Sequence, residues 1–208
     1  MSKEPFIQNR FVKKLEKLLE YFNNYGEVTD GISKLIMEMS EIKTYSSGKF
    51  LDSPLDMKPN IYFVLRGAVR GFVRDDLHEI TTWIALDGSI VGLTSFEKNH
   101  SFNRTQFIQT LEETEVVILP YQLIIALFAS QNEMFLIGRN LLWLHYQQLD
   151  EFNFLARLPT SEKRFMRLNQ IMPGIIQRIK LKYIASLLCM RMETLSRLKS
   201  RLTHEKII

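Results

Sequence analysis

The first forty residues place apolar side chains at the spacing of an amphipathic helix, with Lys and Glu between them. The first run of apolar positions passes through Phe11, Leu15, Leu18 and Phe22. A second run begins at Ile32 and follows Asp30, a residue type that caps helix N-termini. We therefore expect two N-terminal helices, the second of them capped by Asp30.

Beyond about residue 50 the chain changes to short segments rich in β-branched and aromatic residues. These segments are 61–74 (IYFVLRGAVRGFVR), 79–86 (EITTWIAL) and 106–119 (QFIQTLEETEVVIL). Turn residues such as Gly67 and the pair Asp87-Gly88 separate them at the short intervals typical of a β-sandwich or barrel. With helices on both sides, the pattern predicts an α+β fold whose β part is a jelly roll.

Helical periodicity returns at about Gln122 and continues to residue 158, just before Pro159. One line, apolar except for Gln148, passes through Met134, Ile137, Leu141, Leu144, Gln148 and Leu155. A second line passes through Phe135, Leu142, Tyr146, Leu149 and Phe152. One long helix with two apolar faces can cover the β body with one face and pair with a second copy of the chain through the other. Burial of both faces in a single larger core is the alternative.

The segment after Pro159 predicts a separate module of short helices. Thr160 or Ser161 can cap a helix that runs to the breaker pair Pro173-Gly174. A hinge at residues 158–160 then separates this module from the long helix.

The stretch KYIASLLCMRMETLSRLKSRL, residues 182–202, contains two apolar sets on either side of a break at residues 189–191. Two helices of about nine and eleven residues joined by three residues have the size of a helix-turn-helix. The small Ala185 allows the second helix to cross closely, and Leu195 can fill the angle between the two helices.

With those positions buried, polar and basic side chains remain on the outside of the second helix and beside it. A recognition helix places base-reading residues and phosphate-binding residues at such positions. The candidate DNA-binding residues are Lys182, Arg191, Met192, Glu193, Thr194, Ser196, Arg197, Lys199 and Arg201. A plain helical hairpin with solvated basic residues is the alternative.

The charge distribution favours a polyanion as partner of this module. From Thr160 onward the chain has eleven Lys and Arg and three acidic residues, whereas the preceding part has 16 basic and 20 acidic residues. A basic C-terminal quarter on a mildly acidic body is typical of a nucleic-acid-binding tail attached to a domain with another task. A basic surface without a partner would produce the same count.

Several classes of protein are excluded by what the sequence lacks. No run reaches the roughly 18 apolar residues that cross a bilayer, and the N-terminus has no apolar signal region, so we expect a cytoplasmic protein without membrane contact. Cys189, the single cysteine, cannot hold an iron–sulfur cluster or a structural zinc site by itself. The four histidines show no spacing that favours haem or metal binding, and no catalytic motif is present. We therefore expect no enzyme activity and no metal site.

The chain resembles the Crp/Fnr transcription regulators over nearly its whole length. The resemblance rests on five segments in the same order: 61–72 (IYFVLRGAVRGF), 87–92 (DGSIVG), 103–119 (NRTQFIQTLEETEVVIL), 154–165 (FLARLPTSEKRF) and 184–202 (IASLLCMRMETLSRLKSRL).

The resemblance to this family implies three parts of the chain. These are N-terminal helices and a cyclic-nucleotide-binding-like β-roll in 1–121, a long dimerisation helix in 122–158, and a helix-turn-helix DNA-binding domain in 159–208. The residues after Leu202 are too few for a β hairpin, so we expect the subgroup without a wing.

The resemblance assigns roles to residues of the second helix. Glu193 and Arg197 match the family's base-reading Glu and Arg, and Thr194 matches a phosphate-contacting Thr; Arg can bind guanine O6 and N7, and Glu can accept from cytosine N4. Two positions depart from the family pattern. Met192 replaces a further base-reading Arg, and Cys189 replaces the usual turn glycine, which costs about 1 kcal/mol if the turn is left-handed.

A third departure lies at the start of the same helix. Arg191 replaces the usual Ser or Thr cap, which forgoes roughly 1 kcal/mol.

The resemblance also implies a candidate ligand pocket in the β-roll, at Gly92, Leu93, Arg104 and Thr105. Arg104 can bind a phosphate or carboxylate, and Thr105 can add a hydroxyl donor. Leu93 replaces the acid that binds the ribose, so a cyclic nucleotide is a candidate ligand for which we expect weak affinity. An empty pocket with Arg104 in a surface ion pair is the alternative, and we assign no cofactor.

Together these features predict a homodimeric regulator that binds a palindromic site in double-stranded DNA, with RNA polymerase as a further candidate partner. The other hypothesis is a ligand-binding or protein-interaction module whose helix-turn-helix no longer reads DNA.

Overall fold

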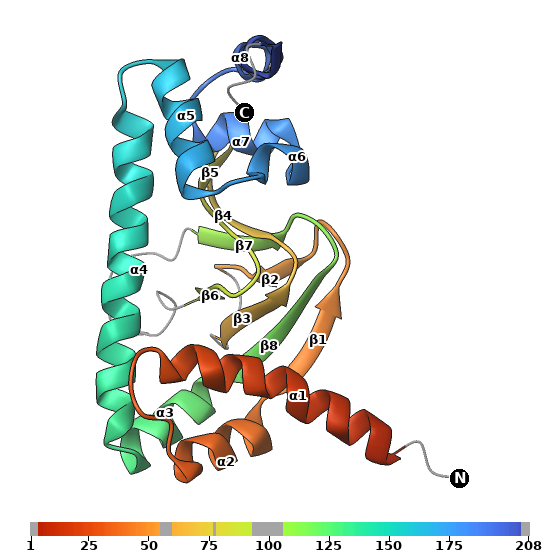
Figure 1. The fold of residues 1–208 in the computed structure, drawn as a ribbon, viewed down its shortest axis with the longest axis vertical. Helices are drawn as coiled ribbons and strands as arrows, with labels where there is room; N and C mark the ends of the chain where they lie inside the picture. Colours follow the sequence, from red (N-terminus) through yellow and green to blue (C-terminus); the bar gives the residue numbers. More distant parts are fainter. Residues whose placement is uncertain (1–3, 55–59, 77, 93–105, 205–208) are drawn as a thin grey trace. The chain divides into compact units, whose positions relative to one another are not determined.

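The computed structural model of the protein describes residues 4–54, 60–76, 78–92 and 106–204 (Figure 1). The chain forms two compact units, Met1–Val69 with Ala85–His145 and Arg70–Ile84 with Tyr146–Ile208. Within the described ranges, no helix is both long and apolar enough to cross a membrane.

Three helices and the first part of a fourth belong to the first unit: α1 (Glu4–Asn23), α2 (Asp30–Met39), α3 (Tyr121–Ser130) and α4 (Glu133–Arg157). The two N-terminal helices are thus confirmed, but the expected cap was wrong by one residue. Thr29 caps α2, because its hydroxyl oxygen accepts from the Ile32 amide at 3.3 Å, and Asp30 is the first helical residue.

The β strands are β1 (Glu41–Tyr45), β2 (Phe50–Asp52), β3 (Asn60–Arg66), β4 (Val69–Asp75), β5 (His78–Ala85), β6 (Ile90–Val91), β7 (Gln106–Thr110) and β8 (Thr114–Pro120). They form two four-stranded sheets in the orders β1-β8-β3-β6 and β2-β7-β4-β5. In the first sheet β8 pairs antiparallel with β1 and with β3. Two antiparallel sheets flanked by helices confirm the α+β class and the β-roll.

The core of the first unit lies where the helices cover one sheet. Leu15, Leu18 and Phe22 of α1 pack with Phe63 of β3 and Val117 of β8 in one buried cluster. The spacing of three and four that predicted α1 therefore marks the face that it buries.

The segment expected to form one long helix is divided into α3 and α4. The backbone of Gln131 is extended, with φ −130° and ψ 106°, and ends α3. The Thr29 hydroxyl donates to Gln131 Oε1 at 3.1 Å, and Gly31 lies so near this side chain that an added Cβ would come within 2.4 Å of Oε1. A contact with the start of α2 thus holds the break, which the local periodicity does not reveal.

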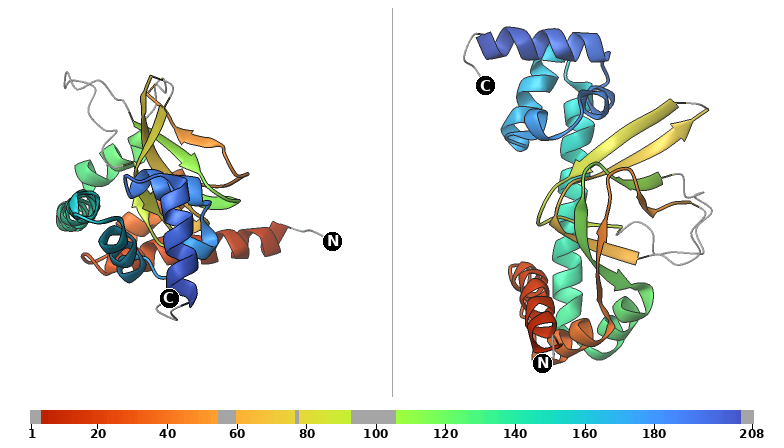
Figure 2. Two further views of the ribbon diagram at one scale, coloured as in Figure 1. Left: turned by 90° about the horizontal axis from the view of Figure 1, so that it is seen from above. Right: turned by 90° about the vertical axis from the view of Figure 1, so that its right-hand side faces the viewer.

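The second unit contains the end of α4 and four further helices: α5 (Ser161–Ile171), α6 (Ile175–Arg178), α7 (Leu181–Leu187) and α8 (Met192–His204). Thr160 caps α5 by accepting from the Lys163 amide at 3.2 Å, so that of the two expected caps Thr160 is the cap and Ser161 the first helical residue. In Figure 2 helix α8 packs across α5 and α7. Residues 70–84 of the β4–β5 hairpin belong to the same compact unit as these helices.

Candidate nucleic-acid interface

A tight left-handed turn joins α7 to α8. Cys189 has φ 51°, its amide donates to Ser186 O at 3.1 Å, and the Met190 amide donates to Ala185 O at 3.0 Å. These two hydrogen bonds and the left-handed residue between them make a Schellman motif, a common helix C-terminus in which glycine is preferred. The turn therefore keeps the conformation that favours glycine although Cys189 occupies it.

The lengths of the two helices differ from the expectation, with seven residues in α7 and 13 in α8. The turn begins at Leu188, so α7 is shorter than its apolar pattern suggested. Two positions assigned to the helix crossing are buried as expected: Leu195 is 0% exposed and Ala185 is 3% exposed. Burial of a large side chain against a small one fixes how α8 crosses α7.

One face of α8 carries the residues expected to read DNA. Met192, Glu193, Ser196 and Arg197 are all exposed. At 100° per residue they fall on one side of the helix, with Glu193 and Arg197 opposite the buried Leu195 and Met192 at the border of that side. The helix-turn-helix thus leaves a hydrogen-bond acceptor, a hydroxyl, a guanidinium and an apolar chain available to a ligand.

The remaining candidates surround this face in different environments. Thr194 and Lys199 are half-buried, and Arg201 donates to Glu162 Oε2 at 2.6 Å, which joins α8 to α5. Arg191 is exposed and precedes the first residue of α8, at the cap position expected from the sequence. Lys182 is exposed, and its ammonium nitrogen lies 4.7 Å from the centroid of the Tyr183 ring.

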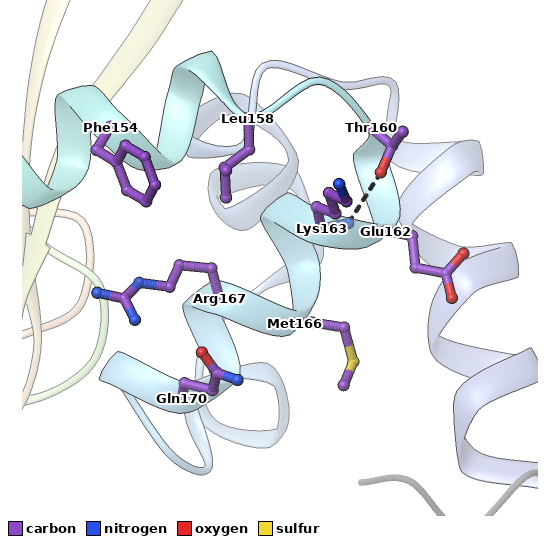
Figure 3. Close-up of a pocket in the computed structure, with 8 residues that line it drawn as sticks. All are labelled: Phe154, Leu158, Thr160, Glu162, Lys163, Met166, Arg167 and Gln170. Atoms are coloured by element: carbon purple, nitrogen blue, oxygen red, sulfur yellow. Dashed lines mark hydrogen bonds between the residues drawn. The ribbon is translucent and has the colours of Figure 1, made fainter.

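A hollow of about 550 Å³ lies between the end of α4 and α5 and was not predicted from the sequence (Figure 3). Its walls are formed by Phe154, Leu158, Thr160, Glu162, Lys163, Met166, Arg167 and Gln170. Arg167 extends toward α4, where its Nε and Nη2 donate to Glu151 Oε1 and Oε2 at 2.6 and 2.7 Å. These bonds lower the pKa of Glu151 and raise that of Arg167. The bidentate pair joins the helices on the two sides of Pro159.

Of the candidate ligand-binding residues, only Gly92 lies in the described ranges. Its φ is 93°, and an added Cβ would come within 2.5 Å of the Asn60 carbonyl oxygen, so glycine is required there. Leu93, Arg104 and Thr105 lie outside the described residues. Where the chain is described, no group of three His, Cys, Asp or Glu side chains could hold a metal ion.

Helix α4 also exposes a broad apolar face. The exposed large side chains on it are Phe135, Leu136, Leu142, Trp143, Tyr146 and Phe154, with exposed fractions from 45% to 63%. Phe135, Leu142 and Tyr146 belong to the second of the two apolar lines in the sequence, whereas Met134, Ile137 and Leu141 of the first line are buried. A face of this kind on a long helix is a candidate interaction surface.

Comparison with known proteins places the fold in one group. No protein-family model and no curated protein sequence matches the chain. Among solved structures, a Crp/Fnr-family transcriptional regulator from Eubacterium rectale is similar with a TM-score of 0.67 at 16% identity, over 86% of this chain and 85% of that one. FixK2 from Bradyrhizobium japonicum has a TM-score of 0.66 at 17% identity, over 81% and 86% of the two chains.

The global regulator CLP from Xanthomonas campestris, which responds to c-di-GMP, has a TM-score of 0.63 at 17% identity, over 86% and 93%. The fold is therefore that of the Crp/Fnr regulators, with a cyclic-nucleotide-binding-like β-roll and a C-terminal helix-turn-helix.

Proposed function

We propose that the protein is a dimeric, sequence-specific DNA-binding transcription regulator of the Crp/Fnr type. The observation that carries this proposal is the exposed face of α8, on which Glu193 and Arg197 lie opposite the fully buried Leu195. The basic charge of the C-terminal module supports the same partner, because phosphate neutralisation supplies much of the affinity for DNA.

The face of α8 offers complementary contacts to base edges. Arg197 donates two hydrogen bonds to guanine O6 and N7, and Glu193 accepts from cytosine N4. Met192 makes apolar contact with a thymine methyl group instead of the hydrogen bonds that arginine would make. The residues that flank this face bind phosphates; they are Thr194, Lys182, Arg191 and Lys199. These phosphate contacts fix the register of the helix on the duplex.

The dimer forms through the exposed apolar face of α4. In this proposal residues 1–121 form the sensing domain, 122–158 the dimerisation segment and 159–208 the DNA-binding domain. Two recognition helices related by a two-fold axis bind a palindrome whose half-sites are about 34 Å apart. The protein acts in the cytoplasm, with RNA polymerase as a further partner.

A small anionic ligand in the β-roll, near Gly92 and Arg104, shifts the population between two dimer arrangements. The c-di-GMP response of the similar regulator from Xanthomonas campestris makes an anionic nucleotide a reasonable first compound to test.

The test compares Arg197→Ala with Lys34→Ala, because both remove one positive charge. Lys34 lies on α2 with its side chain 75% exposed, far along the chain from the helix-turn-helix. We expect Arg197→Ala to lose about 1–3 kcal/mol of binding to the preferred duplex, whereas binding to unrelated DNA changes little.

Lys34→Ala should leave both affinities unchanged. Equal binding of wild type and Arg197→Ala to the preferred duplex would refute the assignment and favour an interaction module that no longer reads DNA.

A further inference from the structure

Arg70 of β4 is a charged residue in an unusually buried place. The residue is only 2% exposed, and it belongs to the compact unit that contains the C-terminal helices. Its guanidinium carbon lies 4.1 Å from the ring centroid of Phe72 and 4.2 Å from that of Tyr183 on α7. The cation thus lies against one ring of its own strand and one ring of the helix-turn-helix.

Arg70 makes two polar contacts with β5, the other strand of the hairpin. Its Nη1 donates to Thr81 Oγ1 at 3.2 Å, and its Nη2 pairs with the Glu79 carboxylate. The same carboxylate lies 3.6 Å from Arg74. The burial of a charge is costly unless it is paired and hydrogen-bonded, and these bonds meet that requirement. The guanidinium is therefore held in place by β4 and β5 and presents its face to Tyr183.

A second contact joins the other strand of the hairpin, β5, to the same helix. The Thr81 amide donates to Ser186 Oγ at 2.9 Å, and the Ser186 hydroxyl donates to Glu79 O at 3.4 Å. Among the strands that the structure describes, β5 is the last of its sheet, and its outer backbone groups lie at the sheet edge. Tyr183 and Ser186 are three residues apart on α7 and therefore face the same side of the helix. One side of α7 therefore contacts the β4–β5 hairpin, through Tyr183 and Ser186.

We propose that α7 docks on the β4–β5 hairpin through Arg70–Tyr183 and Thr81–Ser186, and that this contact positions the helix-turn-helix for reading DNA. Arg70 and Tyr183 are then positioning residues, and this role rests on the function proposed above. The contact leaves the reading face free, because Met192, Glu193 and Arg197 remain exposed while α7 is docked.

Helix α8 is fixed relative to α7 by the burial of Ala185 and Leu195 and by the Schellman turn. The orientation of α7 therefore determines that of α8. In this proposal the docked arrangement is the one that binds DNA. A duplex with two half-sites needs both recognition helices correctly placed, whereas a single half-site needs only one.

The experiment uses the full chain with Tyr183→Leu, Tyr183→Phe and Ser186→Ala. Tyr183→Phe is the matched control, because it keeps the aromatic ring over the guanidinium, and the thermal midpoint of each variant shows that the fold is retained. The first readout is hydrogen exchange of the Thr81 amide without DNA. Exchange should be about tenfold faster in Tyr183→Leu and in Ser186→Ala, and close to wild type in Tyr183→Phe. Equal exchange in all four proteins would overturn the docking.

The second readout is affinity for the duplex that wild type selects from a random pool, compared with the same duplex reduced to one half-site. Tyr183→Leu should lose about tenfold for the two-half-site duplex and much less for the single half-site. Faster exchange with an unchanged ratio of the two affinities would overturn the positioning role. If wild type selects no sequence, the proposed function fails, and the exchange experiment alone still decides whether α7 docks.

Discussion

Replacement of Cys189 by glycine should stabilise the protein, because the native backbone at this position has a conformation that disfavours side chains. Its φ of 51° lies in the left-handed region, and both hydrogen bonds of the turn are made by backbone amides that glycine also has. The thiol is exposed and its nearest polar contact, the Leu187 carbonyl oxygen at 4.0 Å, is weak. The substitution therefore removes strain and little else.

The magnitude follows from two opposing effects. A non-glycine residue in the left-handed region costs about 1–2 kcal/mol, which glycine recovers. Glycine also loosens the unfolded chain, which costs about 0.4–1 kcal/mol. With the middle of each range, the expected net gain is about 0.8 kcal/mol in the free energy of unfolding, measured by urea denaturation at pH 7.

Cys189→Ala is the matched control, because alanine removes the sulfur but keeps the Cβ atom. We expect it to be no more stable than wild type, and Cys189→Val to be less stable since its side chain is β-branched. The reasoning is refuted if glycine and alanine at this position give the same urea midpoint.

Three further predictions concern the start of α8, the face of α4 and the hinge. Arg191→Ser supplies the oxygen that caps a helix and should add about 1 kcal/mol to the free energy of unfolding, whereas Arg191→Ala should add none in the same urea assay. Leu142→Glu places a charge on the exposed apolar face of α4 and should shift the protein from dimer to monomer in analytical ultracentrifugation; an unchanged sedimentation coefficient would contradict this interface. Hydrogen bonds from Arg167 lower the pKa of Glu151 below 4.5, so its stabilising contribution is present above that pH and lost as the pH falls through the lowered value. Glu151→Gln should therefore have a lower urea midpoint than wild type at pH 7, with a difference that shrinks as the pH falls through the lowered pKa of Glu151. A difference that stays constant as the pH falls would contradict the ion pair.

Where local sequence determines structure, most predictions were accurate, although α2 is capped by Thr29 and not by Asp30. Thr160 caps α5, and the crossing of the two C-terminal helices buries Ala185 and Leu195, as expected. Each of these features depends on neighbours within a few residues, so that spacing and residue type suffice to predict it.

Features that depend on distant partners were missed. Strand β1 (EIKTY) is mostly exposed, and its pairing with β8 rather than its apolar pattern makes it a strand. The end of α3 depends on a hydrogen bond between Thr29 and Gln131. Arg70 carries no local sign of burial, because Tyr183, which covers it, lies in another part of the sequence. Sequence periodicity cannot report contacts of this kind.

The candidate site was predicted unevenly for the same reason. The exposed face of α8 follows from helical periodicity, whereas the hollow beside Arg167 needs two helices from the two sides of Pro159. The β-roll pocket stays a prediction at Leu93, Arg104 and Thr105, which lie outside the described residues.

Selection of bound duplexes from a random DNA pool with the purified protein, at two salt concentrations and followed by sequencing, tests the central claim most directly. We predict that a two-fold-symmetric site is enriched, with half-sites about one helical turn apart. Enrichment should persist at the higher salt concentration, although total binding falls as counterions compete for the phosphates. Recovery of only sequence-blind binding that disappears at the higher salt concentration, with and without anionic nucleotides, would contradict the account.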